Sequence, residues 1–242
     1  MVEYTKPDAL IMSETKISKD ISSAEFMPPG FGKPLRNDGK IGERAVKDCY
    51  NLTSVDTPSK LQDIVWGEVA LQQGKKLFLG AYYRTPSGNA TSQLKNTLKV
   101  SLDELSKITR NRSDTTIILG GDFNLGAIDW ENEPVPPSSR DAGPCRDLIE
   151  ILNDHHLTQL QREPTRGEAL LDLYCTNRPT LVKSITTVPN ISDHDGAIVA
   201  DTDIIPKINK KKPREYSVWS QANGERLKVM YQTSLNNFSP LV

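Results

Sequence analysis

Short apolar runs, separated by polar turns and by two helical patterns, dominate the sequence. The run 116–119 is apolar except for its first residue, and Gly120 and Gly121 follow it. This pattern predicts a central strand that is buried on both faces and stops at the glycines. Asp122 and Asn124 come next, and ligands in open α/β sheets collect at the carboxyl ends of such strands. Both residues are therefore candidates for a functional site, with a plain turn after the strand as the alternative.

Further apolar runs predict the rest of the sheet structure. Residues 9–12 predict a buried strand that ends just before Glu14, and the runs 64–71 and 76–84 predict a hairpin. Later strands are expected at 170–176, 184–188 and 196–200. The stretch 33–48 is charged, is broken by glycine and offers no continuous apolar run, so we expect no well-paired strand in it.

Two segments carry helical periodicity. In 91–108, leucine and isoleucine recur at steps of three and four behind Thr91 or Ser92 as the cap, which predicts one amphipathic helix. A second apolar stripe predicts a helix over 145–156, and this helix ends in His155 and His156. Adjacent helical positions diverge and cannot share a ligand. We therefore interpret the two histidines as a helix-end pair that the helix dipole favours.

Composition narrows the function classes without choosing one. The chain has 242 residues, a net charge of -1, an apolar content of 36% and a mean hydropathy of -0.49. We expect one domain over 1–205, followed by a basic linker and polar tail over 206–242. The low net charge means that nucleic-acid binding would need a local basic patch.

Cysteine usage and targeting signals indicate an intracellular protein. The three cysteines are widely separated and match no metal-ligand spacing, which is typical of reduced thiols and argues against a zinc site. No apolar stretch approaches the roughly 20 residues of a membrane helix, and no signal peptide is evident.

Acidic residues at strand ends form the candidate chemistry. Four carboxylates fall at predicted strands or strand ends, accompanied by one amide, one histidine and one tyrosine: Glu14, Asp122, Asp172, Asp193, Asn124, His194 and Tyr83. Such an oxygen-rich set suits Mg²⁺ or Mn²⁺ rather than zinc. For Glu14 and Tyr83, a solvent-facing strand end and plain core are the respective alternatives.

Asp172 and His194 form a predicted pair. An acid inside an apolar strand is costly to bury unless it has a partner, and Asp172 stands between Leu171 and Leu173. A bond from Asp172 to one nitrogen of His194 would fix the tautomer of the ring and favour its charged form. The other ring nitrogen would then be available for a phosphate.

Five motifs in order resemble a known family. They are Ser13-Glu14-Thr15, Tyr82-Tyr83-Arg84-Thr85-Pro86, Gly120-Gly121-Asp122-Phe123-Asn124, Leu171-Asp172-Leu173 with Thr176-Asn177, and Ser192-Asp193-His194. Together with Pro164-Thr165-Arg166, they resemble the endonuclease domain of non-LTR retrotransposon polyproteins, in the endonuclease/exonuclease/phosphatase superfamily. The resemblance covers roughly residues 6–214, and it includes a basic stretch similar to the linker toward a reverse transcriptase.

The resemblance implies a four-layer α/β sandwich of two packed mixed sheets flanked by helices, with the site at the strand ends. It implies that Glu14 binds the metal and that Asp193 assists the metal or the nucleophile. Asp122 would activate the water, and Asn124 would orient the phosphate beside it. Tyr83 would contact the phosphate or the metal shell.

The remaining implied roles concern the histidine and its surroundings. Asp172 would hold His194 against the scissile phosphate, while Thr165 and Ser192 would be supporting hydrogen bonders. The implied activity is Mg²⁺-dependent nicking of DNA in the nucleus, which leaves a 3′-hydroxyl to prime reverse transcription. The intact polyprotein would also carry a reverse transcriptase domain, which this chain lacks.

Two departures from the family pattern weaken the expected activity. The family begins with a strand ending in an asparagine of the metal site, and this chain starts after that strand. The segment 37–44 also replaces a glycine-rich apolar strand. We therefore expect an N-terminally truncated fragment whose nicking is weak or lost. The alternatives are an inactive retroelement remnant and an abasic-site or small-phosphoester hydrolase of the same superfamily.

Overall fold

The structure is a computed structural model, and it describes most of the chain up to Asn209. The described residues are 5–13, 20–22, 25, 27–37, 42–46, 50–55, 63–86, 89–110, 114–132, 135–136, 138–139, 141–189, 194 and 196–209. The chain divides into two units, Met1–Asn209 and Lys210–Val242. The second unit lies outside the described residues.

A six-stranded mixed sheet forms the centre of the first unit, in the order β4-β5-β6-β7-β9-β8. In sequence these strands are β4 (Leu52–Ser54), β5 (Ile64–Ala70), β6 (Lys76–Tyr83), β7 (Thr115–Asp122), β8 (Thr158–Gln159) and β9 (Asp172–Thr176). Only β6 and β7 are parallel, whereas the other neighbours are antiparallel. The predicted hairpin and the predicted central strand are both confirmed, and seven of the eight residues of β7 are buried.

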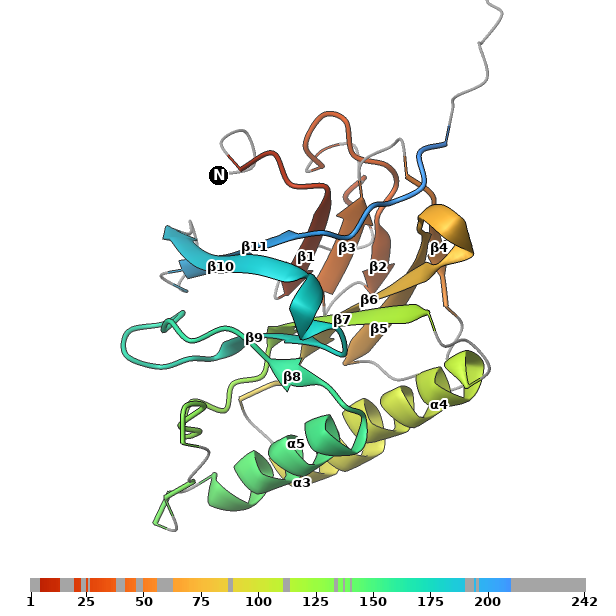
Figure 1. Cartoon of the computed structure of the whole chain (residues 1–242). Coiled ribbons are helices and arrows are strands. Elements are labelled where there is room, and N and C mark those ends of the chain that lie inside the picture. Colours follow the sequence, from red (N-terminus) through yellow and green to blue (C-terminus); the bar gives the residue numbers. More distant parts are fainter. Residues whose placement is uncertain are drawn as a thin grey trace, which may run out of the picture. The chain divides into compact units, whose positions relative to one another are not determined.

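Helices cover one face of this sheet (Figure 1). The crossover between β6 and β7 holds α3 (Ala90–Gln93), a π-helical stretch η2 (Leu94–Lys99) and α4 (Val100–Thr109), and α5 (Ala142–Asp154) follows β7. The predicted leucine stripe packs into the main core with Phe78 and Leu119. The predicted cap is wrong, because the Asn89 side chain accepts the Ser92 N–H at 3.0 Å. The described residues also include two short 3-10 turns, η1 (Gln72–Gly74) and η3 (Pro179–Leu181).

Smaller sheets cover the other face of the central sheet. A three-stranded antiparallel sheet has the order β1-β3-β2, with β1 (Ala9–Ser13), β2 (Leu35–Asn37) and β3 (Gly42–Val46). It packs on β5, β6 and β7. The strands β10 (Val182–Pro189) and β11 (Gly196–Thr202) form an antiparallel pair. The α/β fold with packed sheets and covering helices is thus confirmed, and the described residues supply three of the four predicted layers.

The prediction that residues 33–48 hold no well-paired strand is wrong. Both β2 and β3 fall in this range, and β3 pairs antiparallel with β1 and β2 on its two sides. A strand between two neighbours satisfies its backbone N–H and C=O groups through them, whatever its side chains are. The apolar pattern therefore does not reveal such a strand.

Gly121 allows β6 and β7 to approach each other closely. Its φ angle is +135°, and an added Cβ atom would lie 1.9 Å from the carbonyl oxygen of Tyr82. The strand continues through both glycines to Asp122, so the prediction that they stop it is wrong. What they provide instead is a tight strand pair that carries Asp122 at its end.

The C-terminal part of the described unit returns to the central sheet. Gln72 donates its backbone N–H to the Ile205 carbonyl at 3.2 Å, and Lys207 donates to the Ala70 carbonyl at 2.8 Å. These contacts lie at the end of β5 that pairs with the start of β6. No helix in the described part of the chain is long and apolar enough to cross a membrane.

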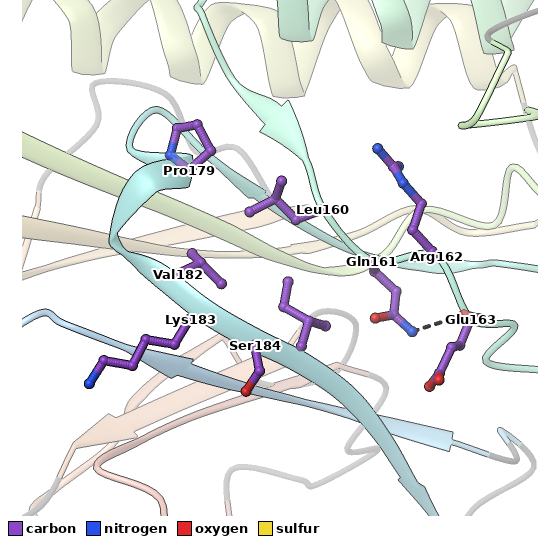
Figure 2. Close-up of a pocket in the computed structure, with 9 residues that line it drawn as sticks. Leu160, Gln161, Arg162, Glu163, Pro179, Val182, Lys183 and Ser184 are labelled. Carbon is purple, nitrogen blue, oxygen red and sulfur yellow. Dashed lines mark hydrogen bonds between the residues drawn. The ribbon is translucent and has the colours of Figure 1, made fainter.

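A separate hollow lies at the β10 side of the central sheet (Figure 2). It has a volume of about 350 Å³, and its lining includes Leu160, Gln161, Val182 and Ile185. The buried Gln161 amide donates to the Glu163 carbonyl and to the Thr187 hydroxyl. None of the predicted site residues that the structure describes lines this hollow, so it does not define the candidate site.

Candidate active site

The sheet places three predicted site residues side by side. Tyr83 ends β6, Asp122 ends β7 and Asp172 begins β9. In the sheet register, Tyr83 pairs with Asp122, and Asp122 pairs with Asp172. Directly opposed residues on neighbouring strands project to the same face. The three side chains therefore form a row at one end of the central strands, as their predicted positions at strands or strand ends imply.

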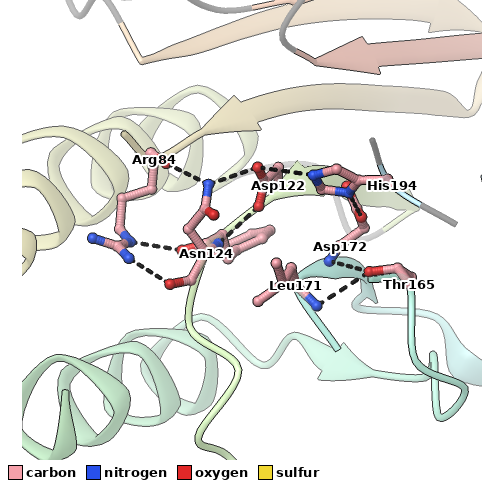
Figure 3. A network of polar contacts seen from close by, with 8 residues as sticks. Arg84, Asp122, Asn124, Thr165, Leu171, Asp172 and His194 are labelled. Carbon is pink, nitrogen blue, oxygen red and sulfur yellow. Dashed lines mark hydrogen bonds and ion pairs between the residues drawn. The ribbon is translucent and has the colours of Figure 1, made fainter. Parts of the chain in front are cut away.

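His194 contacts both carboxylates of this row (Figure 3). Its Nδ1 lies 2.5 Å from Asp172 Oδ2, and its Nε2 lies 3.7 Å from Asp122 Oδ2. Because a carboxylate only accepts hydrogen bonds, Nδ1 carries the proton in this contact. The predicted contact between Asp172 and His194 is thus present. The side chain of His194 is 9% exposed, that of Asp172 is 18% exposed and that of Asp122 is 2% exposed.

Asn124 holds the Asp122 carboxylate from the other side. Its backbone N–H donates to Asp122 Oδ1 at 2.9 Å, and its side-chain Nδ2 donates to Asp122 Oδ2 at 2.6 Å. Asn124 has a φ angle of +49°, a left-handed conformation that asparagine tolerates better than most residues do. Phe123 is fully buried between them and packs on Tyr82. The turn thus aims both polar side chains at the edge and anchors itself in the core.

Sequence reasoning missed the part that Arg84 plays in this turn. Its side chain is buried, and it donates from Nε to the Phe123 carbonyl at 2.7 Å and from a terminal nitrogen to the Asn124 carbonyl at 2.5 Å. A basic residue at a strand end is usually solvated, and this expectation hid the role. The available signal was its place directly after Tyr83 and before Thr85-Pro86, where the strand must turn.

Thr165 supports the Asp172 side of the site. The Thr165 hydroxyl is fully buried and accepts the backbone N–H of Leu171 at 3.2 Å and that of Asp172 at 3.0 Å. Its carbonyl accepts the N–H of Gly196 at 3.2 Å. One residue therefore ties the start of β9 to the start of β11, which lies just after His194.

Three predicted site residues cannot be placed. Glu14, Ser192 and Asp193 lie outside the described residues. Among the residues that the structure describes, no three His, Cys, Asp or Glu side chains are grouped to hold a metal ion. Both Asp122 oxygens accept hydrogen bonds from Asn124. The described residues alone therefore do not make the predicted metal site.

The arrangement has the chemical elements of phosphoester cleavage. Asp122 is a buried base that could take a proton from water, and His194 is a donor beside it. Asn124 and Asp172 fix the orientation of these two groups. A phosphate oxygen at the strand ends would meet Nε2 of His194, which donates when the ring is doubly protonated, and would face the carboxylate that activates the water. Hydrolysis of a phosphate ester is therefore the reaction that this geometry suits.

Comparison with known proteins identifies the class. The fold is that of the endonuclease/exonuclease/phosphatase superfamily, and the chain has a nuclease/phosphatase-like fold. The model of the family described as "Endonuclease-reverse transcriptase" matches residues 77–198. This match spans half of the chain, so the protein belongs to that family. A search of curated proteins found no match.

Solved structures share the fold at low sequence identity. The 3′ phosphatase NExo from Neisseria, bound to a product DNA hairpin, is 16% identical, with a TM-score of 0.56 and coverage of 84% of this chain and 91% of that one. TDP2 from D. rerio, complexed with a single-strand DNA product, is 13% identical, with a TM-score of 0.55 and coverage of 82% and 87%. The APE2 catalytic domain from Xenopus laevis is 12% identical, with a TM-score of 0.53 and coverage of 87% and 88%.

Proposed function

We propose that this protein hydrolyses phosphodiester bonds and nicks DNA to prime the reverse transcription of a retroelement. The observation that carries the proposal is the row in which His194 stands between Asp172 and Asp122, with Asn124 on the far side of the Asp122 carboxylate. Membership of the endonuclease-reverse transcriptase family supports it. DNA in two structures with the same fold supports DNA as the substrate.

Each described residue has one role in this reaction. Water attacks the phosphorus, its oxygen forms the new bond, and Asp122 takes the proton. The bond from phosphorus to the 3′ oxygen breaks, and the departing oxygen takes a proton from solvent, which gives a 3′-hydroxyl and a 5′-phosphate. His194 donates to the phosphoryl oxygens, where charge develops. Tyr83, beside Asp122 in the sheet, contacts the phosphate.

The proposal includes a divalent metal ion. We propose Glu14 and Asp193 as ligands for Mg²⁺ or Mn²⁺, which supplies charge neutralisation at the phosphate when it is bound. A reverse transcriptase elsewhere in the same polyprotein, and a nuclear location, follow from the family and belong to the same proposal.

A plasmid assay tests the proposal. Purified full chain and supercoiled plasmid are incubated with Mg²⁺ or Mn²⁺, with and without EDTA, and open circles are scored. We expect weak nicking that EDTA stops, with ends that a DNA polymerase extends. Asp122→Asn should abolish it, whereas Asp129→Asn, at an exposed loop acid, should not. An inactive wild-type chain, or equal nicking by Asp122→Asn, would refute the proposal.

A second candidate is phosphate removal or abasic-site cleavage rather than nicking of intact DNA. It is favoured by the likeness to a structure described as a 3′ phosphatase, because the same row of residues could serve a terminal phosphate. A DNA hairpin with a 3′-phosphate and a duplex with one abasic site separate the two candidates. Turnover of these substrates without plasmid nicking would favour the second candidate.

A further inference from the structure

The guanidinium of Arg84 is buried among carbonyl oxygens. Arg84 is 3% exposed, and its side chain donates to the carbonyls of Phe123, Asn124 and Thr85 at 2.7, 2.5 and 3.3 Å. Its backbone N–H donates to the Asp122 carbonyl at 2.9 Å. Within the described part of the chain, no carboxylate pairs with this cation. Three consecutive carbonyls, from Asp122 to Asn124, are thus bound by one residue.

Such an arrangement is energetically unfavourable, and a purely structural contact would not require it. Burial of a charged group without an opposite charge is unfavourable, and an apolar side chain could fill the same space. The rigid fork of arginine, however, suits two neighbouring carbonyls. Those carbonyls belong to a turn in which Asn124 is held at φ +49°, a conformation that costs about 1 kcal/mol or more outside glycine. The bonds of Arg84 therefore stabilise this particular turn.

Asn124 transmits the position of Arg84 to Asp122. The Asn124 side-chain Nδ2 donates both to the Arg84 carbonyl at 2.8 Å and to Asp122 Oδ2 at 2.6 Å. The same Asp122 oxygen lies 3.7 Å from His194 Nε2. A hydrogen-bonded chain thus runs from Arg84 through Asn124 to the carboxylate that faces His194 (Figure 3).

We propose that Arg84 is a positioning residue, which sets the orientation of the Asp122 carboxylate toward His194 by clamping Asn124 in its left-handed turn. The kinetic part of this inference rests on the proposed function, whereas its geometric part does not. Arg84 does not itself reach the reacting atoms. Its effect depends on the intact side chain of Asn124.

The kinetic experiment compares Arg84→Lys with Arg162→Lys. Lysine keeps the charge but cannot bind the two carbonyls as a fork, and Arg162 is an exposed arginine outside the site. We expect Arg84→Lys to lower kcat for nicking by about 10- to 100-fold, the effect of a small misplacement of a catalytic group, with little change in KM. Arg162→Lys should leave kcat unchanged.

Coupling to Asn124 separates positioning from general stability. Asn124→Gly tolerates the left-handed backbone but removes the side-chain link to Asp122. It should lower kcat by itself, and in its background Arg84→Lys should add less than about 3-fold, since the two act in series. Equal fold-losses from Arg84→Lys in both backgrounds would overturn the inference.

Magnetic resonance of the histidine rings tests the inference even if the protein has no nicking activity. The chain has three histidines, so a His194→Gln spectrum identifies the ring resonances of His194. Arg84→Lys and Asn124→Gly should both move these resonances and leave those of His155 in place, even if the wild type nicks no DNA. If Arg84→Lys does not fold, Arg84→Gln, which also lacks the fork that binds the two carbonyls, takes its place. Unmoved His194 resonances in every folded variant would refute the role of Arg84, whatever the fate of the proposed function.

Discussion

Two histidines of this protein have side chains that are little exposed and that lie beside acids in different surroundings. The side chains of His155 and His194 are 8% and 9% exposed. His155 stands at the end of α5 with Nε2 3.2 Å from Asp103, a carboxylate that is 46% exposed. His194 stands at the strand ends, 2.5 Å from Asp172 and 3.7 Å from Asp122, and these carboxylates are 18% and 2% exposed. The exposed fractions of the acidic partners therefore differ far more than those of the two histidine side chains.

Hydrogen-bond geometry separates the two sites further. The contact of His194 with Asp172 is a hydrogen bond. The Nε2 atom of His155, in contrast, has no hydrogen-bond partner in the described structure despite its closeness to Asp103, because distance without alignment is not enough. Its Nδ1 faces the Ser106 hydroxyl at 3.2 Å. A buried histidine beside an acid therefore marks a site only where buried carboxylates orient it.

The largest expected difference is in catalysis. His194→Gln should lower plasmid nicking by about 10²–10³-fold, the loss that follows removal of one donor to a developing charge. His155→Gln should change the rate by less than about 2-fold, since His155 contacts Asp103 and Ser106 of α4 and none of the site residues. Gel quantification of open circles over time measures both. Similar losses in the two variants would break the comparison.

Substitutions of the acidic partners, Asp172 and Asp103, should show the same contrast in nicking rate with smaller effects. Asp172→Asn keeps the size of the side chain but weakens the hold on His194 Nδ1, and we expect a loss of about 10- to 100-fold in nicking. Asp103→Asn changes an exposed partner of His155 and should leave the rate near that of the wild type. The same assay, with melting curves to verify folding, decides between them. Full activity of Asp172→Asn would remove the proposed pair from the reaction.

The sequence pattern was sufficient to predict the part of the site that lies on strands. Asp122 follows one apolar run and Asp172 lies within another, and their convergence was predicted from this placement at strands together with the family resemblance. The contact of Asp172 with His194 was predictable for a second reason, the cost of an acid within an apolar strand. The roles of Glu14, Ser192 and Asp193 stay predictions, because these residues lie outside the described part of the chain.

The pattern failed where backbone groups decide the structure. Strand β3 was missed because its pairing on both sides is made by backbone groups, which an apolar pattern does not reveal. Arg84 was missed because its partners are carbonyl oxygens, which no residue type in the sequence reveals. For His155 the dipole interpretation of the helix end was incomplete. Burial is the larger influence there, and it lowers the pKa of the ring below its ordinary value.

Two threonine substitutions, Thr165→Val and Thr97→Val, extend the comparison to the stability of the fold. Thr165→Val removes the acceptor of the N–H groups of Leu171 and Asp172. Two part-buried donors would then lack a partner, at a cost of up to about 1–3 kcal/mol each. We also expect a loss of nicking, because the start of β9 carries Asp172. Thr97→Val, on the helical side near Asp63, should lower stability without this loss. Urea denaturation and the plasmid assay together test the pair.

The smallest expected effect is a pH dependence of stability that belongs to His155. Burial lowers its pKa, and Lys99 and His156 act in the same direction, while Asp103 and Asp154 oppose it. The folded state thus keeps the ring neutral at pH values where the unfolded chain already takes up a proton. The free energy of unfolding should therefore fall as the pH drops through about 6.5, the ordinary value for histidine, and level off below the folded-state pKa. Melting curves between pH 7.5 and 5.5 should show a shallower decline for His155→Gln than for the wild type. An unchanged slope in His155→Gln would show that the surroundings of His155 do not oppose its protonation, and the contrast with His194 would then rest on the carboxylates alone.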